Sequence, residues 1–339
     1  MTTPLTILGR ALLPLLLSLP LWAKDCPDAV LLARLQALSE VTPAELREQL
    51  REDRLLARHA RSRYGAELKA PSRVGYGRQA RIALAWQQLV APIADAPLKA
   101  RLARAKFDGS TLGLDDHTWT GEQLAPYLNY QGRLALAERD QAFLQRSLSN
   151  LAALELTPEV LVEAGWPSTR IQCSRALVAN RLDRQWLQQH LGLGADPHHD
   201  SDHLRRLAAA VTREEIAHYY QAHRADFRQL DEVDVHLYLG DNRDDLKPQS
   251  NAPVTLKRAE AQGDVLKTLA FVTPADGKSA VIRLPDGRFG QAELLARRFK
   301  TLAADSESVA YVARQAIARQ KAKAQFQALL ARLKREEVP

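Results

Sequence analysis

Apolar residues recur along most of the chain at the spacing of an amphipathic helix. Leu and Ala stand at positions i, i+3, i+4 and i+7, while Arg, Gln and Glu fill the opposite faces. The alternation typical of strands is scarce and is confined to residues 230–295, where it predicts strands over 233–239 and 280–284. The pattern therefore predicts a mostly α-helical protein with one small α+β domain.

Several helix starts carry capping signals. In VTPAELREQL, Thr42 is the expected N-cap, Pro43 takes the first helical position and Glu45 is the reciprocal capping partner. This signal predicts a helix that runs from there to about Tyr64. The same kind of signal predicts further starts at three places: Thr120 with Gln123, Thr157 with Pro158, and Thr212 with Glu215.

Longer periodic segments predict three more helices, over 175–193, near 256–271 and over 306–335. The run DGSTLGLDDHTWTGEQ is interpreted as a loop between helices, because it is rich in Gly, Asp and Thr. It contains Asp115, Asp116 and His117, which could in principle serve acid–base chemistry. The loop interpretation is favoured over a catalytic one.

The first 23 residues have the layout of a cleavable signal peptide. A short polar start with Arg10 leads into an apolar stretch from Ala11 to Trp22, and Ala23 supplies the small residue. The apolar stretch is too short for a good membrane span. Since no later segment is apolar enough to span a bilayer, we expect an exported chain without stable membrane insertion, located in the bacterial periplasm.

Two cysteines follow the predicted leader, Cys26 and Cys173. They lie far apart in sequence and lack CxxC spacing, which argues against a redox or metal site. A structural disulfide between the mature N-terminus and the helical body is the favoured interpretation in an oxidising compartment. Unpaired buried thiols are the alternative.

The chain of 339 residues has a formal net charge of +7. Its Lys and Arg residues are spread over helix faces together with Asp and Glu, and no nucleic-acid-binding motif accompanies them. Nucleic acid is therefore not an expected partner, whereas acidic polypeptides or a membrane surface would be attracted. The sequence also lacks a P-loop, a GxGxxG motif and a GxSxG elbow, so neither a nucleotide cofactor nor a serine nucleophile is predicted.

The tract ADPHHDSDH (195–203) gathers His198, His199 and His203 among three Asp residues. Imidazole and carboxylate groups in this number can hold zinc, nickel or copper. Short His-rich tracts bind metals opportunistically, however, so a solvated linker is the favoured interpretation. No metal site is predicted, and the three histidines are weak candidates only.

RALVANRLDRQWLQQHLGL followed by VTREEIAHYYQAHRADFRQLDEVDVHLYL is similar in order and spacing to the SurA-type and PrsA-type periplasmic foldases. In those proteins a helix of the VTREEIAHYY type feeds the first strand of a parvulin prolyl isomerase domain. LKTLAFVTPADGKSAVIRLPDGRFGQAELLARR resembles the closing half of such a domain, and SESVAYVARQAIARQKAKAQFQALLARLK resembles the C-terminal helix that returns to the chaperone body. The resemblance covers residues 170–335, and residues 24–169 share only helical character and secretion with the family.

The chain departs from the family at the two histidines of the parvulin site. An alignment through the alternating residues of 233–239 puts Leu237 at the first histidine position, and His236 lies one residue early on the opposite face of the strand. The second histidine follows a Phe-Gly-aromatic step in the family, and Ala292 stands there in this chain. The central helices and the Gly-rich segment of a complete parvulin domain are also missing. The resemblance thus implies a degenerate parvulin-like domain with little or no activity and no catalytic residues.

The resemblance implies four segments: a signal peptide (1–23), a helical chaperone-like domain (24–228), the degenerate parvulin-like domain (229–298) and a C-terminal helix (299–339) that packs back on the helical domain. The first functional hypothesis is an ATP-independent periplasmic chaperone, or foldase, without a cofactor. Its expected partners are unfolded or extended polypeptides, outer-membrane or secreted proteins among them. Most of the aromatic residues before residue 190 are expected in the core, but Trp119 and Tyr127 are candidates for a groove that accepts aromatic-rich client segments.

Two alternatives stay open at this point. One is an active prolyl isomerase with an unorthodox apolar pocket, whose floor candidates are Tyr238, Phe271 and Phe289. The other is an assembly factor dedicated to one secreted partner, in which the small domain serves as a docking module.

Overall fold

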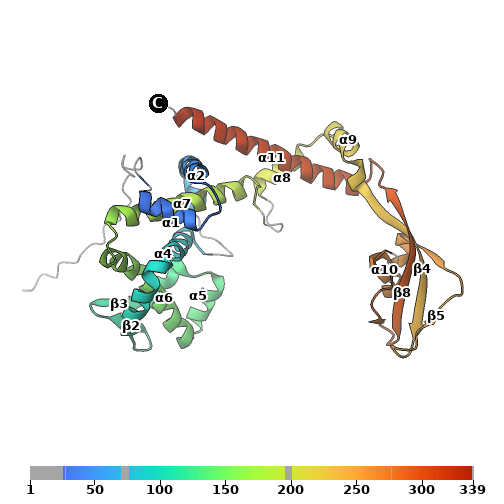
Figure 1. The fold of residues 1–339 in the computed structure, drawn as a ribbon, viewed down its shortest axis with the longest axis horizontal. Coiled ribbons are helices and arrows are strands. Elements are labelled where there is room, and N and C mark those ends of the chain that lie inside the picture. The colour runs from blue at the N-terminus through green and yellow to red at the C-terminus, as the bar shows by residue number, and fades with distance from the viewer. Residues whose placement is uncertain (1–25, 27, 70–75, 195–200, 276, 338–339) are drawn as a thin grey trace, which may run out of the picture. The chain divides into compact units, whose positions relative to one another are not determined.

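The computed structural model describes residues 26, 28–69, 76–194, 201–275 and 277–337. The predicted signal peptide lies outside these residues. Among the described helices, none is long and apolar enough to cross a membrane. The fold class is the predicted one, mostly α-helical with a small α+β region (Figure 1).

The chain divides into two compact units. One comprises Met1–Asp196 together with Gln325–Pro339 and is called the helical unit below. The other comprises Pro197–Ala324 and is called the sheet unit. This division lies at residues 196/197 and 324/325, whereas the resemblance implies boundaries at 228/229 and 298/299. The α8 and α9 helices and the first part of α11 therefore group with the sheet.

The elements of the helical unit are α1 (Ala29–Ala37), α2 (Pro43–Arg63), α3 (Gly65–Lys69), α4 (Arg78–Leu102), β1 (Lys106–Phe107), β2 (Thr111–Leu114), β3 (His117–Thr120), the 3-10 helix η2 (Gly121–Tyr127), α5 (Tyr130–Ala137), α6 (Gln141–Glu163), α7 (Ser168–His190) and the end of α11 (Glu307–Glu337).

Of the three α-helix starts predicted from capping signals in the helical unit, only the one at Thr42 forms as predicted. The Thr42 box is confirmed and begins α2. The signal at Thr120 begins a 3-10 helix rather than an α-helix. The predicted start at Thr157 is wrong, because α6 begins at its N-cap Asp140 and continues through Pro158. The hydroxyl of Thr157 is buried and donates to the carbonyl of Ala153 at 2.6 Å, within the same helix.

A three-stranded antiparallel sheet, β1-β2-β3, replaces the loop predicted for DGSTLGLDDHTWTGEQ. Leu112 pairs with Trp119 across the hairpin, and both side chains are buried. The two-residue turn between β2 and β3 begins at Asp115, which has a φ of 51°. Asp tolerates this left-handed region, so a tight turn forms without glycine. The loop prediction is wrong because the burial of alternate apolar residues stabilises strands here.

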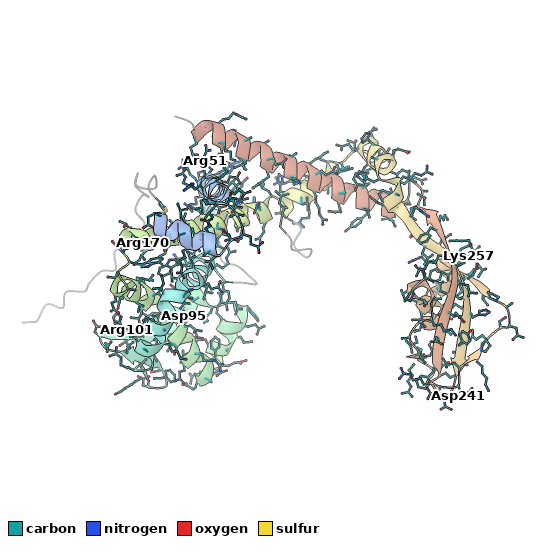
Figure 2. The ribbon with its side chains drawn as sticks, in the orientation of Figure 1. Arg51, Asp95, Arg101, Arg170, Asp241 and Lys257 are labelled. Atoms are coloured by element: carbon teal, nitrogen blue, oxygen red, sulfur yellow. A yellow bond between two sulfur atoms is a disulfide. The ribbon has the colours of Figure 1, made fainter. Side chains whose placement is uncertain are left out.

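The core of the helical unit lies between α4, α6 and α7. Trp86 is buried there, and its indole Nε1 donates to Ser174 Oγ at 2.8 Å. Ser174 in turn donates to the carbonyl of Ile171, so no polar atom of this pair is left without a partner. The C-terminal turns of α11 pack on α2 and α7, where Phe326 contacts Leu56, Ala60 and Leu187. Arg51 of α2, which is labelled in Figure 2, also forms an ion pair with Glu337, with 2.8 Å between Nε and Oε2.

The sheet unit contains a five-stranded antiparallel sheet in the order β5-β4-β8-β7, with β6 also paired to β4. Its two long central strands are β4 and β8, and α10 lies against one face (Figure 1). On that face Val233, Val235 and Leu237 of β4 form a core with Ala292 and Leu294 of β8. The elements are α8 (Asp202–Ala209), α9 (Arg213–Ala222), η3 (Arg224–Phe227), β4 (Arg228–Gly240), β5 (Lys247–Pro248), β6 (Val254–Lys257), η4 (Arg258–Ala261), α10 (Val265–Val272), β7 (Ile282–Arg283), β8 (Phe289–Thr301) and the first part of α11.

The details of this unit differ from the prediction in several places. The predicted helix near 256–271 begins only at Val265, because Val254–Lys257 pairs with β4 as a strand. Gly263 has a φ of 82° and separates the strand and the short η4 helix from α10. The predicted strand over 280–284 shortens to β7, and β8 and α8 were not predicted. The helix start at Thr212 is confirmed, with its capping box to Glu215.

Candidate functional site

The two positions at which the family carries its histidines are direct cross-strand neighbours. Leu237 of β4 pairs with Ala292 of β8, and their exposed fractions are 6% and 0%. Both belong to the apolar core beneath α10. An aliphatic pair in this place has no donor, acceptor or titratable group to offer a substrate. These two positions therefore fill the core of the sheet unit.

The opposite face of the same strands carries polar and titratable side chains. Tyr238 donates its hydroxyl proton to Glu293 at 2.5 Å, and Lys278 lies 5.2 Å above the tyrosine ring. The hydrogen bond with Glu293 raises the pKa of Tyr238 above its ordinary value and lowers that of Glu293. His236 pairs with Glu293 across the strands, so it lies on this face, away from the Leu237–Ala292 pair.

The predicted apolar floor of Tyr238, Phe271 and Phe289 does not assemble. Phe271 of α10 packs against the core on one face of the sheet, whereas Tyr238 lies on the other face. Phe289 pairs with Gly240 at the end of the strands. Because side chains alternate between the two faces, Phe289 lies on the same face as Tyr238 and opposite the core. A hollow of about 340 Å³ does lie in this unit, but none of the three aromatic residues lines it. The pocket prediction is wrong because the pleat of the sheet separates its members.

A larger pocket, of about 490 Å³, lies in the helical unit between α4, η2, α5 and α6. This is within the size range of ligand pockets in proteins. Its walls carry no Asp, Glu, Lys, Arg or His, and most of them are apolar. The residues that line it are Tyr76, Leu84, Leu124, Tyr127, Leu128, Asn129, Gln131, Gly132, Ala135, Phe143, Ser147, Asn150, Leu151 and Leu154.

Three polar side chains in this pocket have no hydrogen-bond partner within the described part of the chain. They are Gln131 of α5 and Ser147 and Asn150 of α6. Their side chains neither donate nor accept a hydrogen bond from any described residue. An amide side chain both donates and accepts, and a hydroxyl does the same. The pocket thus combines an apolar floor with neutral groups that match a peptide backbone.

The two predicted groove residues have different positions. Tyr127 lines the pocket, where burial, and then the nearby Glu155, raise the pKa of its phenol. Trp119 is 1% exposed and donates its indole proton to Glu155 at 2.8 Å. Its ring stacks on His117, 5.6 Å away between centroids. Because a side chain buried in this way cannot reach a client on the surface, the groove prediction is wrong for Trp119.

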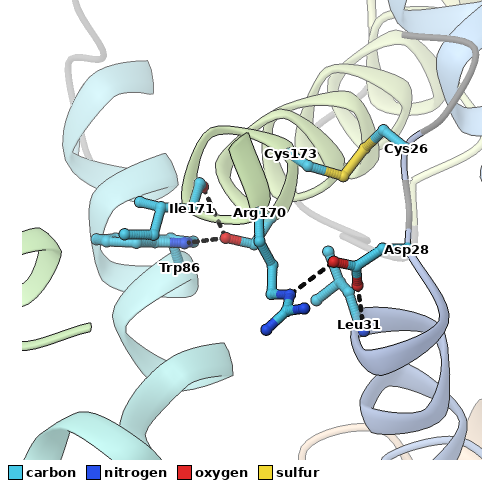
Figure 3. The surroundings of a disulfide bond; sticks show 8 residues. Cys26, Asp28, Leu31, Trp86, Arg170, Ile171 and Cys173 are labelled. Atoms are coloured by element: carbon cyan, nitrogen blue, oxygen red, sulfur yellow. Dashed lines mark hydrogen bonds and ion pairs between the residues drawn. A yellow bond between two sulfur atoms is a disulfide. The ribbon is translucent and has the colours of Figure 1, made fainter. Parts of the chain in front are cut away.

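Cys26 and Cys173 form a disulfide that links the segment before α1 to α7 (Figure 3). Their Cα atoms lie 5.8 Å apart. Asp28 strengthens the same junction, since it accepts from Arg170 of α7 at 2.6 Å and caps α1 through Leu31 at 2.9 Å. The disulfide therefore holds the beginning of the described chain against the helical core.

One of the three candidate histidines of the 195–203 tract lies within the described residues. His198 and His199 lie outside the described residues, and His203 lies in α8. Within the described parts of the chain, no group of three His, Cys, Asp or Glu side chains is arranged to hold a metal ion.

The sequence interpretation missed a buried ionic cluster in the helical unit. The Asp183 carboxylate accepts from Arg61 and from both ends of the Arg78 guanidinium fork, each at 2.7 Å. Nearby, Asp53 forms an ion pair with Arg184 at 2.7 Å, and burial raises the pKa of Asp53 despite that partner. These groups join α2, α4 and α7 and line neither of the two pockets described above. They are structural.

Among the solved structures that are similar to this chain, two carry the description of a chaperone or a foldase. No family model matches the chain, and no curated protein matches it. One similar chain comes from PEB4 and Cj1289 of Campylobacter jejuni, described as two structurally related SurA-like chaperones; identity is 16%, coverage is 64% of this chain and 80% of that chain, and the TM-score is 0.22. The other is the foldase protein PrsA of Streptococcus pneumoniae, with 14% identity, coverage of 75% and 85%, and a TM-score of 0.20. TM-scores this low do not establish a common arrangement of the chain.

Proposed function

We propose that this protein is an ATP-independent periplasmic chaperone that binds unfolded or partly folded exported polypeptides. The observation that carries the proposal is the neutral, mainly apolar pocket of about 490 Å³ in the helical unit. The pattern of the first residues, typical of a signal peptide, and the Cys26–Cys173 disulfide support an oxidising compartment outside the cytoplasm.

The pocket matches the chemistry of an unfolded chain. Its apolar walls suit a large apolar or aromatic client side chain, because burial of such a side chain contributes about 1.5–3 kcal/mol. Gln131, Ser147 and Asn150 offer neutral donors and acceptors to the adjoining peptide groups. One such contact is weak, and it becomes useful when a client binds at several places with fast exchange. A chaperone of this kind releases its client without nucleotide hydrolysis.

The sheet unit supports the second part of the proposal, which is little or no prolyl isomerase activity. Rotation about a prolyl bond has a barrier of about 18–20 kcal/mol, and catalysis needs polar groups that stabilise the twisted amide. Leu237 and Ala292 offer none, and Tyr238 and Phe271 lie on opposite faces of the sheet. Without an assembled pocket, the domain lacks the means to seat a proline ring.

Aggregation of an unfolded outer-membrane protein tests the proposal. The purified mature protein should suppress light scattering, and Ser147→Phe, which places a ring in the pocket, should raise the concentration needed by about tenfold, or about 1.4 kcal/mol. Gln145→Phe on the exposed side of the same helix is the matched control and should behave as the wild type. Equal suppression by the two variants would show that clients bind elsewhere.

Exchange of an Xaa-Pro peptide, followed by NMR with the same sample, separates the alternatives. We expect no exchange above the uncatalysed rate. Measurable catalysis would favour the isomerase hypothesis instead. Absence of both catalysis and aggregation suppression would favour an assembly factor with one dedicated partner.

A further inference from the structure

The long strand β8 has an open edge along its second half. On the side away from β4, residues 289–294 are covered, because β7 pairs with Phe289 and Gly290, and the Leu294 amide donates to Gly277 at 2.9 Å. Beyond Leu294 no strand of the described chain lies on that side. The edge of β8 over residues 295–301 is therefore unpaired, although its other side is paired to β4 as far as Thr301.

The register shows which backbone groups point toward this open edge. The Leu302 amide donates to the Phe227 carbonyl at 3.0 Å, so this pair is a hydrogen-bonded one. Hydrogen-bonded and non-bonded pairs alternate along an antiparallel ladder. The pairs Arg228–Thr301 and Leu230–Phe299 are then non-bonded, and their N–H and C=O groups point outward. Arg258 confirms this on the β4 side, where its Nε donates to the outward carbonyl of Leu230 at 2.8 Å.

On the β8 side, no side chain of the described residues bonds to the outward N–H and C=O groups of Phe299 and Thr301 in the way that Arg258 bonds to Leu230. They form no backbone hydrogen bond across the open edge in the described structure. They lie two residues apart, which is the spacing at which an added strand exchanges hydrogen bonds. The two edges of the β4–β8 ribbon therefore differ, one closed by Arg258 and one open.

The side chains at the open edge are apolar and basic. Phe299 is 50% exposed and Leu295 43% exposed. Arg298 is saturated by Glu232 and Asp234, but Lys300 has no carboxylate partner in the described chain. The Arg228 guanidinium lies over the Phe299 ring, 5.3 Å from its centroid. Arg228 also has no carboxylate partner in the described chain. Natural edges are often protected by charge, yet protection alone does not require a half-exposed aromatic ring. An acidic extended segment would complement both the backbone and these charges.

We propose that the open edge of β8 at residues 297–301 binds an extended, acidic client segment as an added β-strand. Main-chain hydrogen bonds to Phe299 and Thr301 hold the segment, an apolar client side chain contacts the Phe299 ring on one face of the strand, and client carboxylates contact Lys300 on the other face. The inference rests on the proposed chaperone function and names a class of client segment for it. The edge recognises conformation and charge, whereas the pocket of the helical unit recognises neutral apolar groups.

Binding of short peptides to the full mature protein tests this site separately from the pocket. An eight-residue peptide of alternating Val and Glu should bind, and the amides of Phe299 and Thr301 should become protected from hydrogen exchange. The same peptide with N-methyl groups on alternate residues cannot form the ladder and should bind at least tenfold more weakly. This comparison uses the unmodified protein. If the two peptides bind equally well, the proposal is wrong.

Two variant pairs complete the test. Phe299→Pro removes the outward N–H, while Phe299→Val keeps it, so the Pro variant should bind the peptide at least tenfold more weakly than the Val variant. Lys300→Glu should weaken binding of the acidic peptide severalfold, and Lys323→Glu on α11 should not. If Phe299→Val and Phe299→Pro bind equally, the edge is not the site. Loss of aggregation suppression in Ser147→Phe together with unchanged peptide binding in these variants would retain the chaperone function and reject the edge.

Discussion

The helical unit and the sheet unit both hold an Asp carboxylate with arginine, but at opposite degrees of burial. Asp183 is 1% exposed and is bound by Arg61 and Arg78 from two other helices. Asp234 lies on the solvent face of β4 and accepts from Arg298 at 2.7 Å and from Thr255 at 2.6 Å. The distances are nearly the same, and only the surroundings differ.

The surroundings decide what each cluster does. A buried carboxylate has lost its water, so its stability depends on the arginines that replace it. An exposed ion pair is screened by solvent and contributes little. The helical unit thus uses charge to join its helices, while the sheet unit builds its core from aliphatic residues and leaves its charges on the surface.

The largest effect predicted from this comparison is that of Asp183→Ala. The change removes the carboxylate that pairs with two half-buried arginines, of which only Arg61 keeps another acceptor, Asn180, within the described chain, and we expect the free energy of unfolding of the helical unit to fall by about 3–5 kcal/mol. Asp234→Ala should leave the stability of the helical unit unchanged. Urea unfolding followed by tryptophan fluorescence measures the difference, because Trp86, Trp119, Trp166 and Trp186 all lie in the helical unit. A midpoint shared by the two variants would contradict the structural role of Asp183.

The second prediction compares two neighbours within β4. Leu237→Ala should reduce the stability of the sheet unit by about 2–5 kcal/mol, because it removes a buried side chain from the core beneath α10. His236→Ala, on the exposed face, should change it by less than about 0.5 kcal/mol. Hydrogen exchange of β4 and β8 amides reports this unit separately from the tryptophans. Similar losses for both variants would mean that the two faces of the sheet are not distinct.

The sequence alone predicts those features that depend on a few adjacent residues. The capping boxes at Thr42 and Thr212 form as predicted, since each requires only a hydroxyl and a carboxylate three residues apart. The final helix was placed within two residues at each end. The alignment-based positions Leu237 and Ala292 prove to be direct cross-strand neighbours.

Local signals fail where two of them compete or where the pattern is short. The Thr157 signal lies inside α6 because Asp140 caps the helix earlier, with Oδ1 accepting from the Phe143 amide at 2.9 Å. The β2–β3 hairpin has only four residues in each strand, and its turn has Asp115 where a glycine would have marked it. The alternation of Leu112 and Leu114 was the available signal.

The candidate site was the least predictable part, because distant segments build it. The pocket takes residues from α4, η2, α5 and α6, and only Tyr127 was named from the sequence. Asp183 meets Arg61 and Arg78 across 122 and 105 residues of sequence. The open edge of β8 follows from strand register, which periodicity alone does not fix. These features arise from tertiary packing.

The third prediction concerns the Cys26–Cys173 disulfide. Among the described residues, this bond lies in the helical unit and the sheet unit has none. Cys26→Ser with Cys173→Ser should lower the stability of the helical unit by about 2–4 kcal/mol, because the bond closes a long loop in the unfolded chain. The sequence separation is 147 residues. The sheet unit should keep its hydrogen-exchange protection. If tryptophan fluorescence shows the same midpoint for the double variant and the oxidised protein, the bond does not stabilise this unit.

The smallest predicted effect concerns the exposed cluster around Asp234. Hydrogen bonds from Arg298 and then Thr255 lower the pKa of Asp234 from 3.8 to about 2. Because the folded pKa is depressed, its contribution to stability is complete above about pH 4 and is lost as the pH falls through 2. The carboxyl ¹³C resonance of Asp234 should titrate near pH 2 in the wild type and at a higher pH in Arg298→Ala, still below 3.8 because Thr255 continues to donate to the carboxylate. Arg288→Ala, which removes the separate partner of Asp286, is the control and should leave Asp234 unchanged. Titration of Asp234 near 3.8 in the wild type would show that solvent screens the pair completely, and the contrast with Asp183 would then be larger still.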